Sequence, residues 1–152
     1  DRKINLRTLV EYEGSGKPLA DLFGLGADDL EYLVVAAVRE FYRPARQKLR
    51  SESESTKTTG RDDMRSFADA CRMISDRAAE KGQVALALLA AHNRASAYGV
   101  LGDPATQATI NRVVLQSVEV GGEDWQQDPD LRFVHSKARS EERRVGKECS
   151  LP

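Results

Sequence analysis

The sequence predicts an all-α protein. Apolar residues recur at helical spacing in several segments, and aromatic residues make up only 6% of the chain, so Leu, Val and Ala must supply most of the core. We expect a helix-turn-helix-like N-terminal half and a helical hairpin in the C-terminal half, with a short C-terminal strand left open. The expected regions are an N-terminal helical region (1–50), a flexible linker (51–60), a hairpin and oligomerisation region (61–120) and a poorly ordered tail (121–138).

In the N-terminal region, Pro18 begins a short expected helix that ends at Gly24. A second helix begins near Leu30, because apolar residues follow at i+3, i+4, i+7 and i+8 for more than three turns. Its acidic residues lie at the N-terminal end and its basic residues at the C-terminal end, as the helix dipole favours. We expect Pro44 to kink or break this helix.

The segment 51–60 contains no large apolar side chain, which indicates a flexible linker. Helices are expected from about 62 to 81 and from 83 to 98, and Gly82 between them is expected to adopt a left-handed C-cap. The run 84–91 is apolar on all sides, and one small domain has little with which to cover it. We therefore expect a homo-oligomer with an interface at Val84, Leu86, Leu88 and Leu89.

Asp103-Pro104 is typical of an N-cap followed by proline at the first helical position. The segment 110–120 fits both a helix and a strand with one mixed face. Its β-branched residues favour a helix that gives way to a short strand. After Gly121 the chain is mostly polar, and we expect poor order there.

Composition restricts the function classes. The formal net charge is −1, so overall charge does not indicate nucleic-acid binding. No run reaches the roughly 20 apolar residues of a membrane span, and we expect no membrane contact. Cys71 is the only cysteine before residue 139, so a disulfide within that part is excluded and a reduced, cytoplasmic setting is expected.

Signals for catalysis are weak. Gly14-Ser15-Gly16-Lys17 is similar to part of a phosphate-binding loop, but the first glycine of that motif is missing and Pro18 replaces its Ser or Thr. His92 has no second metal ligand at helical spacing, and we expect it to be solvated or hydrogen-bonded. Cys71 lies on an apolar face, where it acts as a small hydrophobe. We expect no enzymatic activity, no metal and no cofactor.

One concentrated group of basic residues offers a candidate nucleic-acid contact. It could touch phosphate groups, although a solvated helix end that complements the dipole would have the same composition. The candidate residues are Arg39, Arg43, Arg46, Lys48 and Arg50.

The segment 19–33 resembles a helix-turn-helix pattern, with Ala20, then Gly24 four residues later, and Leu25, Leu30 and Leu33 at the positions that bury the junction. Together with the helices ending at Gly82 and Tyr98 and the β-branched segment up to Val120, this looks like the small terminase subunits of tailed phages. The resemblance implies an oligomer that binds packaging-site DNA and a large terminase inside a bacterial host. The alternative is a helical protein-interaction or structural module that binds no nucleic acid.

The segment from Arg139 to Cys149 resembles, residue for residue, the translation of a common sequencing adapter. This resemblance implies that 139–152 was never selected to pack against the rest of the protein. We therefore expect removal of 139–152 to leave folding unchanged.

Overall fold

The computed structural model describes residues 30–120 and 122–150, and the side chains of 122, 123 and 145–150 are not described. The elements are α3 (Leu30–Ala37), a π-helical segment η1 (Val38–Tyr42), α4 (Arg43–Leu49), α5 (Glu54–Glu80), α6 (Val84–Val100), α7 (Pro104–Glu119), a 3-10 segment η2 (Gly122–Gln127) and α8 (Pro129–Ser150). The all-α prediction is confirmed for this part of the chain, which contains no strand. The comparison with a phosphate-binding loop, the helix 18–23 and the first helix of the helix-turn-helix pattern lie outside the described residues.

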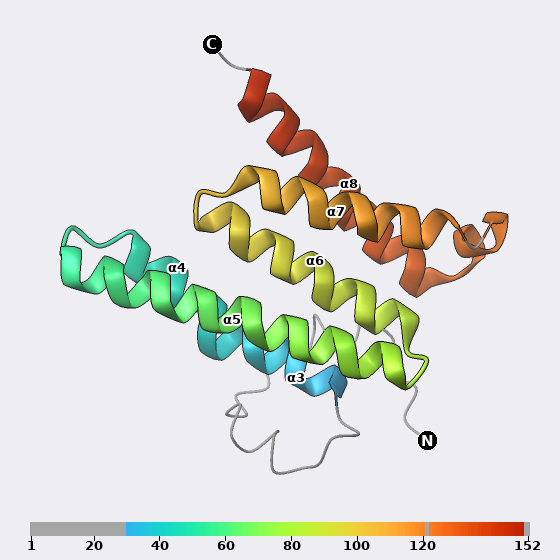
Figure 1. The fold of residues 1–152 in the computed structure, drawn as a ribbon, viewed down its shortest axis with the longest axis horizontal. Helices are drawn as coiled ribbons and strands as arrows, with labels where there is room; N and C mark the ends of the chain where they lie inside the picture. Colours follow the sequence, from blue (N-terminus) through green and yellow to red (C-terminus); the bar gives the residue numbers. More distant parts are fainter. Residues whose placement is uncertain (1–29, 121, 151–152) are drawn as a thin grey trace.

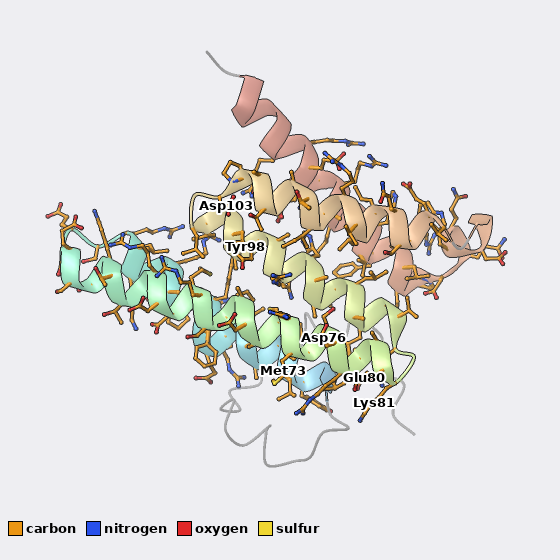
Figure 2. The ribbon with its side chains drawn as sticks, viewed as in Figure 1. Met73, Asp76, Glu80, Lys81, Tyr98 and Asp103 are labelled. Carbon is orange, nitrogen blue, oxygen red and sulfur yellow. The ribbon has the colours of Figure 1, made fainter. Side chains whose placement is uncertain are left out.

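Helices α5, α6 and α7 lie side by side as successive antiparallel neighbours, with α8 behind α7 and the α3–α4 segment against α5 (Figure 1). Gly82 and Gly102, in the two connecting turns, have φ values of 74° and 82°, and Gly82 confirms the predicted left-handed C-cap. Asp103 caps α7 as predicted, because its side chain accepts a hydrogen bond from the Thr106 N–H. Figure 2 shows Tyr98 and Asp103 on the two sides of this turn, where the Asp103 N–H donates to the Tyr98 carbonyl.

Pro44 does not break the helix, so that alternative was wrong: the helix continues through Pro44 with a π-helical segment immediately before it, and the kink stays a prediction. The N–H of Arg43 donates to the carbonyl of Val38, five residues earlier, instead of four. Pro44 then occupies the first turn of α4, where its missing N–H is tolerated. The wider turn keeps the chain helical from Leu30 to Leu49.

The prediction of a flexible linker over 51–60 was also wrong for most of that segment, since Glu54 to Gly60 form the first turns of α5. Ser53 is the N-cap, and its hydroxyl accepts a hydrogen bond from the Thr56 N–H at 3.3 Å. This cap lets a polar segment begin a helix without apolar residues of its own. Packing against α4 supplies the remaining stabilisation.

Gly60 allows the close approach of α4 and α5. A Cβ atom at this position would lie 2.9 Å from the Lys48 Cβ and 3.0 Å from the Ala45 carbonyl oxygen. Both neighbours are fixed in the α4 backbone, so neither can move aside like the end of a flexible side chain. The glycine that looked like part of a linker is therefore a packing contact.

The expected C-terminal strand is absent from the described residues, because α7 remains helical to Glu119. Val114, Leu115 and Val118 are buried at helical spacing, and this burial outweighs the strand preference of β-branched residues. Val120, which fitted only the strand pattern, is 85% exposed at the end of the helix.

The expectation of a poorly ordered tail was wrong for 122–138, which form η2 and the first part of α8. Val134 and Ala138 are fully buried, and the Trp125 ring stacks on His135 at 4.3 Å. Helix α8 continues through the adapter-like segment, and its last turns project beyond the other helices (Figure 1). In the described part of the chain, none of the helices combines the length and apolar character needed to cross a membrane.

We predict that Gly60→Ala destabilises the protein by about 1–3 kcal/mol, because the clash with α4 exceeds the roughly 0.5–1 kcal/mol that alanine contributes by stiffening a helix. Urea denaturation measures the difference. Thr59→Ala, at the exposed neighbouring position, is the matched control and should change stability little. An unchanged or higher stability for Gly60→Ala would contradict the close α4–α5 contact.

Candidate functional site

The structure divides the basic cluster into half-buried and exposed members. Arg39 and Lys48 are half-buried: Arg39 contacts Glu40 at 3.3 Å, and the Lys48 ammonium forms an ion pair with Asp63 at 2.5 Å. Arg43, Arg46 and Arg50 are exposed. The Arg46 guanidinium lies 5.7 Å from the centroid of the Tyr42 ring, which orients it along α4.

The three exposed arginines share one face of α4 and its C-cap, since their spacing of three and four residues returns to the same side of a helix. No acidic residue occurs in the sequence between Glu40 and Glu52. We call Arg43, Arg46 and Arg50 the α4 arginine face. Its charges are solvent-exposed and close together, which is the arrangement that suits a polyanion.

The residues expected at an oligomer interface lie mostly inside the chain's own core. Leu86 and Leu89 are 4% and 5% exposed, Leu88 packs partly against the same core, and only Val84 is largely exposed, at 56%. Helices α5, α7 and α8 all contact α6. The expectation that one chain has too little to cover α6 was therefore wrong, because α7 and α8 also pack against it.

A polar cluster that sequence reasoning did not assemble lies between α6, α7 and α8. The Nδ1 of His92 is 3.0 Å from Oδ1 of Asn111, and Nδ2 of Asn111 donates to Oε1 of Glu141 at 2.7 Å. The Ser96 hydroxyl donates to Oε2 of Glu141 at 2.5 Å. His92 and Asn111 are 5% and 0% exposed, so the hydrogen-bonded alternative for His92 is the one that the structure adopts.

The geometry assigns the proton of His92. A carboxylate only accepts, so Asn111 must present its NH2 group to Glu141 and its carbonyl oxygen to His92. His92 therefore donates from Nδ1, which leaves Nε2 as the acceptor nitrogen of a neutral ring. That Nε2 atom lies 3.9 Å from Oε2 of Glu141, too far for a direct hydrogen bond.

Burial sets the charge states in the cluster. Burial lowers the pKa of His92, and this effect outweighs the opposing influence of Glu141 and of the Asn111 hydrogen bond. Burial alone would raise the pKa of Glu141, but the nearby His92 and the hydrogen bonds from Ser96 and Asn111 hold that pKa below its usual value. The cluster therefore contains a neutral imidazole beside a carboxylate at neutral pH.

A cleft of about 300 Å³ opens beside this cluster, between the α3–η1 segment, α5, α6 and α8. Its deep wall is apolar and includes Val34, Phe67 and Leu89, which are at most 5% exposed. Its polar lining includes His92, Ser96 and Lys137. We call this space the α6/α8 cleft.

Ser96 and the His92 ring do not form a nucleophile–base pair, because the Ser96 hydroxyl bonds to Glu141 and to the His92 carbonyl and not to the ring. Among the described residues, no group of three or more His, Cys, Asp or Glu side chains could hold a metal ion. Cys71 is 1% exposed, and burial raises the pKa of its thiol, as suits a small hydrophobe. The absence of enzymatic activity remains a prediction.

The sequence did contain a signal for the cluster. His92 and Ser96 are four residues apart, as are Gln107 and Asn111 on the next helix, so each pair marks one polar position on consecutive turns of an apolar face. Glu141 is harder to predict, because it lies in the segment that resembles an adapter.

Comparison of the chain with protein-family models, with curated proteins and with solved structures finds no match in any of the three. Functional inference therefore depends on the charges, cavities and contacts of this chain alone.

Acidification should lower the stability. As the pH falls through about 6.5, the unfolded chain protonates His92 while the folded chain, with its lower pKa, does not, so unfolding becomes more favourable. Protonation of Glu141 at lower pH adds in the same direction. Urea denaturation between about pH 7 and pH 5 should show the decline, and His92→Gln should reduce it. His135→Gln is the control and should retain the decline in stability. If the free energy of unfolding falls equally with pH in His92→Gln and in the unaltered protein, the buried neutral imidazole is contradicted.

The adapter resemblance predicts that removing 139–152 leaves folding unchanged, whereas the structure predicts a loss of stability. The truncation deletes Glu141 and leaves the buried Asn111 amide without its acceptor, which should cost about 1–3 kcal/mol. Thermal melts of the full and truncated chains test this. Glu141→Gln in the full chain isolates the contribution of the charge. Equal melting temperatures for all three would show that the segment contributes nothing to the fold.

Proposed function

We propose that this protein binds the phosphate backbone of duplex DNA through the α4 arginine face. The observation that carries the proposal is the alignment of three exposed arginines on one side of α4, with no acidic residue between Glu40 and Glu52. Phosphate contacts of this kind supply most of the affinity in non-specific binding and need no particular base sequence.

Dimensions support the proposal. Arg43 and Arg50 are seven residues apart, which is about 10 Å along a helix axis. One DNA strand rises about 3.4 Å per nucleotide, so the face spans about three nucleotides. The overall charge of −1 offers no general attraction to DNA, and the contact therefore depends on these local charges.

The narrower proposal is a DNA-packaging role like that of phage small terminase subunits. It would require a ring of several copies and a large terminase as partner. Helix α6 does not argue for a ring, because α5, α7 and α8 contact it within one chain. Sedimentation at micromolar concentration tests this narrower form: a stable assembly of several copies would favour packaging, and a monomer would leave only the DNA contact.

Neutralising the α4 arginine face tests the DNA contact. The variant Arg43→Gln/Arg46→Gln/Arg50→Gln should weaken binding to duplex DNA. It should also reduce the slope of log affinity against log salt by about 1 for each phosphate group that the variant no longer neutralises. The measurement is a fluorescence-anisotropy titration at several salt concentrations.

The matched control is Arg72→Gln/Arg77→Gln/Arg112→Gln, which removes the same charge from exposed positions on α5 and α7. It should leave most of the affinity and the slope in place. If the two triple variants behave alike, the arginines of α4 are a solvated helix end, and the interaction-module alternative replaces DNA binding.

A further inference from the structure

The α6/α8 cleft is too large to be a packing defect. Protein interiors are packed as densely as organic crystals, and one water molecule in the liquid occupies about 30 Å³. A space of about 300 Å³ is instead at the lower end of the range for small-molecule sites. Because its deep wall consists of valine, leucine and phenylalanine side chains, water gains few hydrogen bonds there.

The outer end of the cleft is basic. Lys137 is exposed, and its ammonium lies 5.2 Å from the centroid of the Phe133 ring, which also lines the cleft. A second space of about 390 Å³ also has Arg46 in its lining, and the residues that it shares with the cleft are Tyr42, His92, Ser96, Lys137 and Glu141. Arg46 in turn lies over the Tyr42 ring. Each of these cations therefore rests on an aromatic ring at the border between apolar wall and solvent.

The polar groups His92, Ser96 and Glu141 are already hydrogen-bonded within the protein. The Glu141 carboxylate already accepts hydrogen bonds from Ser96 and Asn111, and the His92 ring is hydrogen-bonded to Asn111. Glu141 lines both spaces and repels a negatively charged group, whereas Arg46, Lys137 and Arg144 attract one in the second space. Val34, Phe67 and Leu89 line the cleft but not the second space, so an apolar group is favoured in the cleft and an anionic group in the second space.

We propose that the α6/α8 cleft binds a free medium-chain carboxylate, with its alkyl chain against Val34, Phe67 and Leu89 and its carboxylate at Lys137 and Arg46. Burial of each methylene contributes about 0.8 kcal/mol, so the chain supplies most of the affinity and the ion pair sets the orientation. Lys137, Arg46 and the apolar lining of the cleft all precede Arg139, and the assignment does not depend on DNA binding.

Isothermal titration calorimetry of the full-length protein with decanoate tests the site. Decanoate should bind with micromolar to submillimolar affinity, decanol more weakly, and decylammonium more weakly still because Lys137 repels its charge. Acetate, which lacks the chain, should not bind. Failure of decanoate to bind at millimolar concentration, or tighter binding of decylammonium than of decanoate, would overturn the proposal.

Lys137→Gln tests the orientation without disturbing the core, since the side chain is exposed. It should weaken decanoate binding about three- to fivefold, the size expected for one solvent-exposed ion pair, and leave decanol binding unchanged. Lys81→Gln, at the far end of α5, is the charge-matched control and should bind both compounds normally. Equal decanoate affinity for Lys137→Gln and Lys81→Gln would contradict the placement of the carboxylate.

Val38→Phe tests the cavity itself, because Val38 lines the cleft and is only half-buried. The larger ring should occupy the space and abolish binding of both decanoate and decanol. Circular dichroism verifies that the variant is folded. If the variant misfolds, the ligand series and Lys137→Gln decide whether the proposal holds. A folded Val38→Phe protein that binds decanoate as before would place the ligand elsewhere and overturn the proposal.

Discussion

Helix α6 is apolar around its first turns, and the need to cover every side of it determines how the other helices are arranged. Leu86, Leu89 and Ala90 are buried in one cluster with residues of α3, α5, α7 and α8. An apolar helix exposed to water on any side would forfeit about 25 cal/mol for each Å² of apolar surface left uncovered. The chain covers these turns itself except at Val84, which is 56% exposed, so α6 gives little physical reason for inferring an oligomer.

The same central helix carries the polar cluster. His92 and Ser96 follow the apolar turns of α6, and Asn111 and Glu141 reach them from α7 and α8. Buried polar groups are tolerated only when they are hydrogen-bonded, so these contacts restrict how α7 and α8 can slide along α6. The cluster also forms one boundary of the α6/α8 cleft, which links the packing of the bundle to that cleft.

Two local features bring α4 against α5 and present the arginine face. The π-helical turn before Pro44 keeps the chain helical from α3 into α4, which carries the arginines. Gly60 then allows α5 to pack closely on α4. Lys48 is held in its ion pair with Asp63, whereas Arg43, Arg46 and Arg50 remain at the surface. The packing of α5 on α4 therefore separates the half-buried Lys48 from these exposed arginines.

Local information in the sequence was sufficient for the helical class, for the turn at Gly82 and for the N-cap at Asp103, because helical periodicity, left-handed glycine and side-chain capping act over a few residues. The errors concern interactions between distant segments. The segment 54–60 is helical because Gly60 packs on α4, 110–119 stays helical because Val114 and Val118 are buried, and Val134 and Ala138 order α8 by packing against the core.

The candidate sites divide in the same way. The basic residues of α4 could be found from their spacing, since a helix turn separates them, but their division into half-buried and exposed members depends on α5, which carries Asp63. His92, Asn111 and Glu141 are separated by 19 and 30 residues along the chain, so no local pattern brings them together. The sequence by itself determined the helical class and where several of the helices begin and end. Only the tertiary structure decided which polar residues meet and where a cleft remains, because both depend on long-range packing.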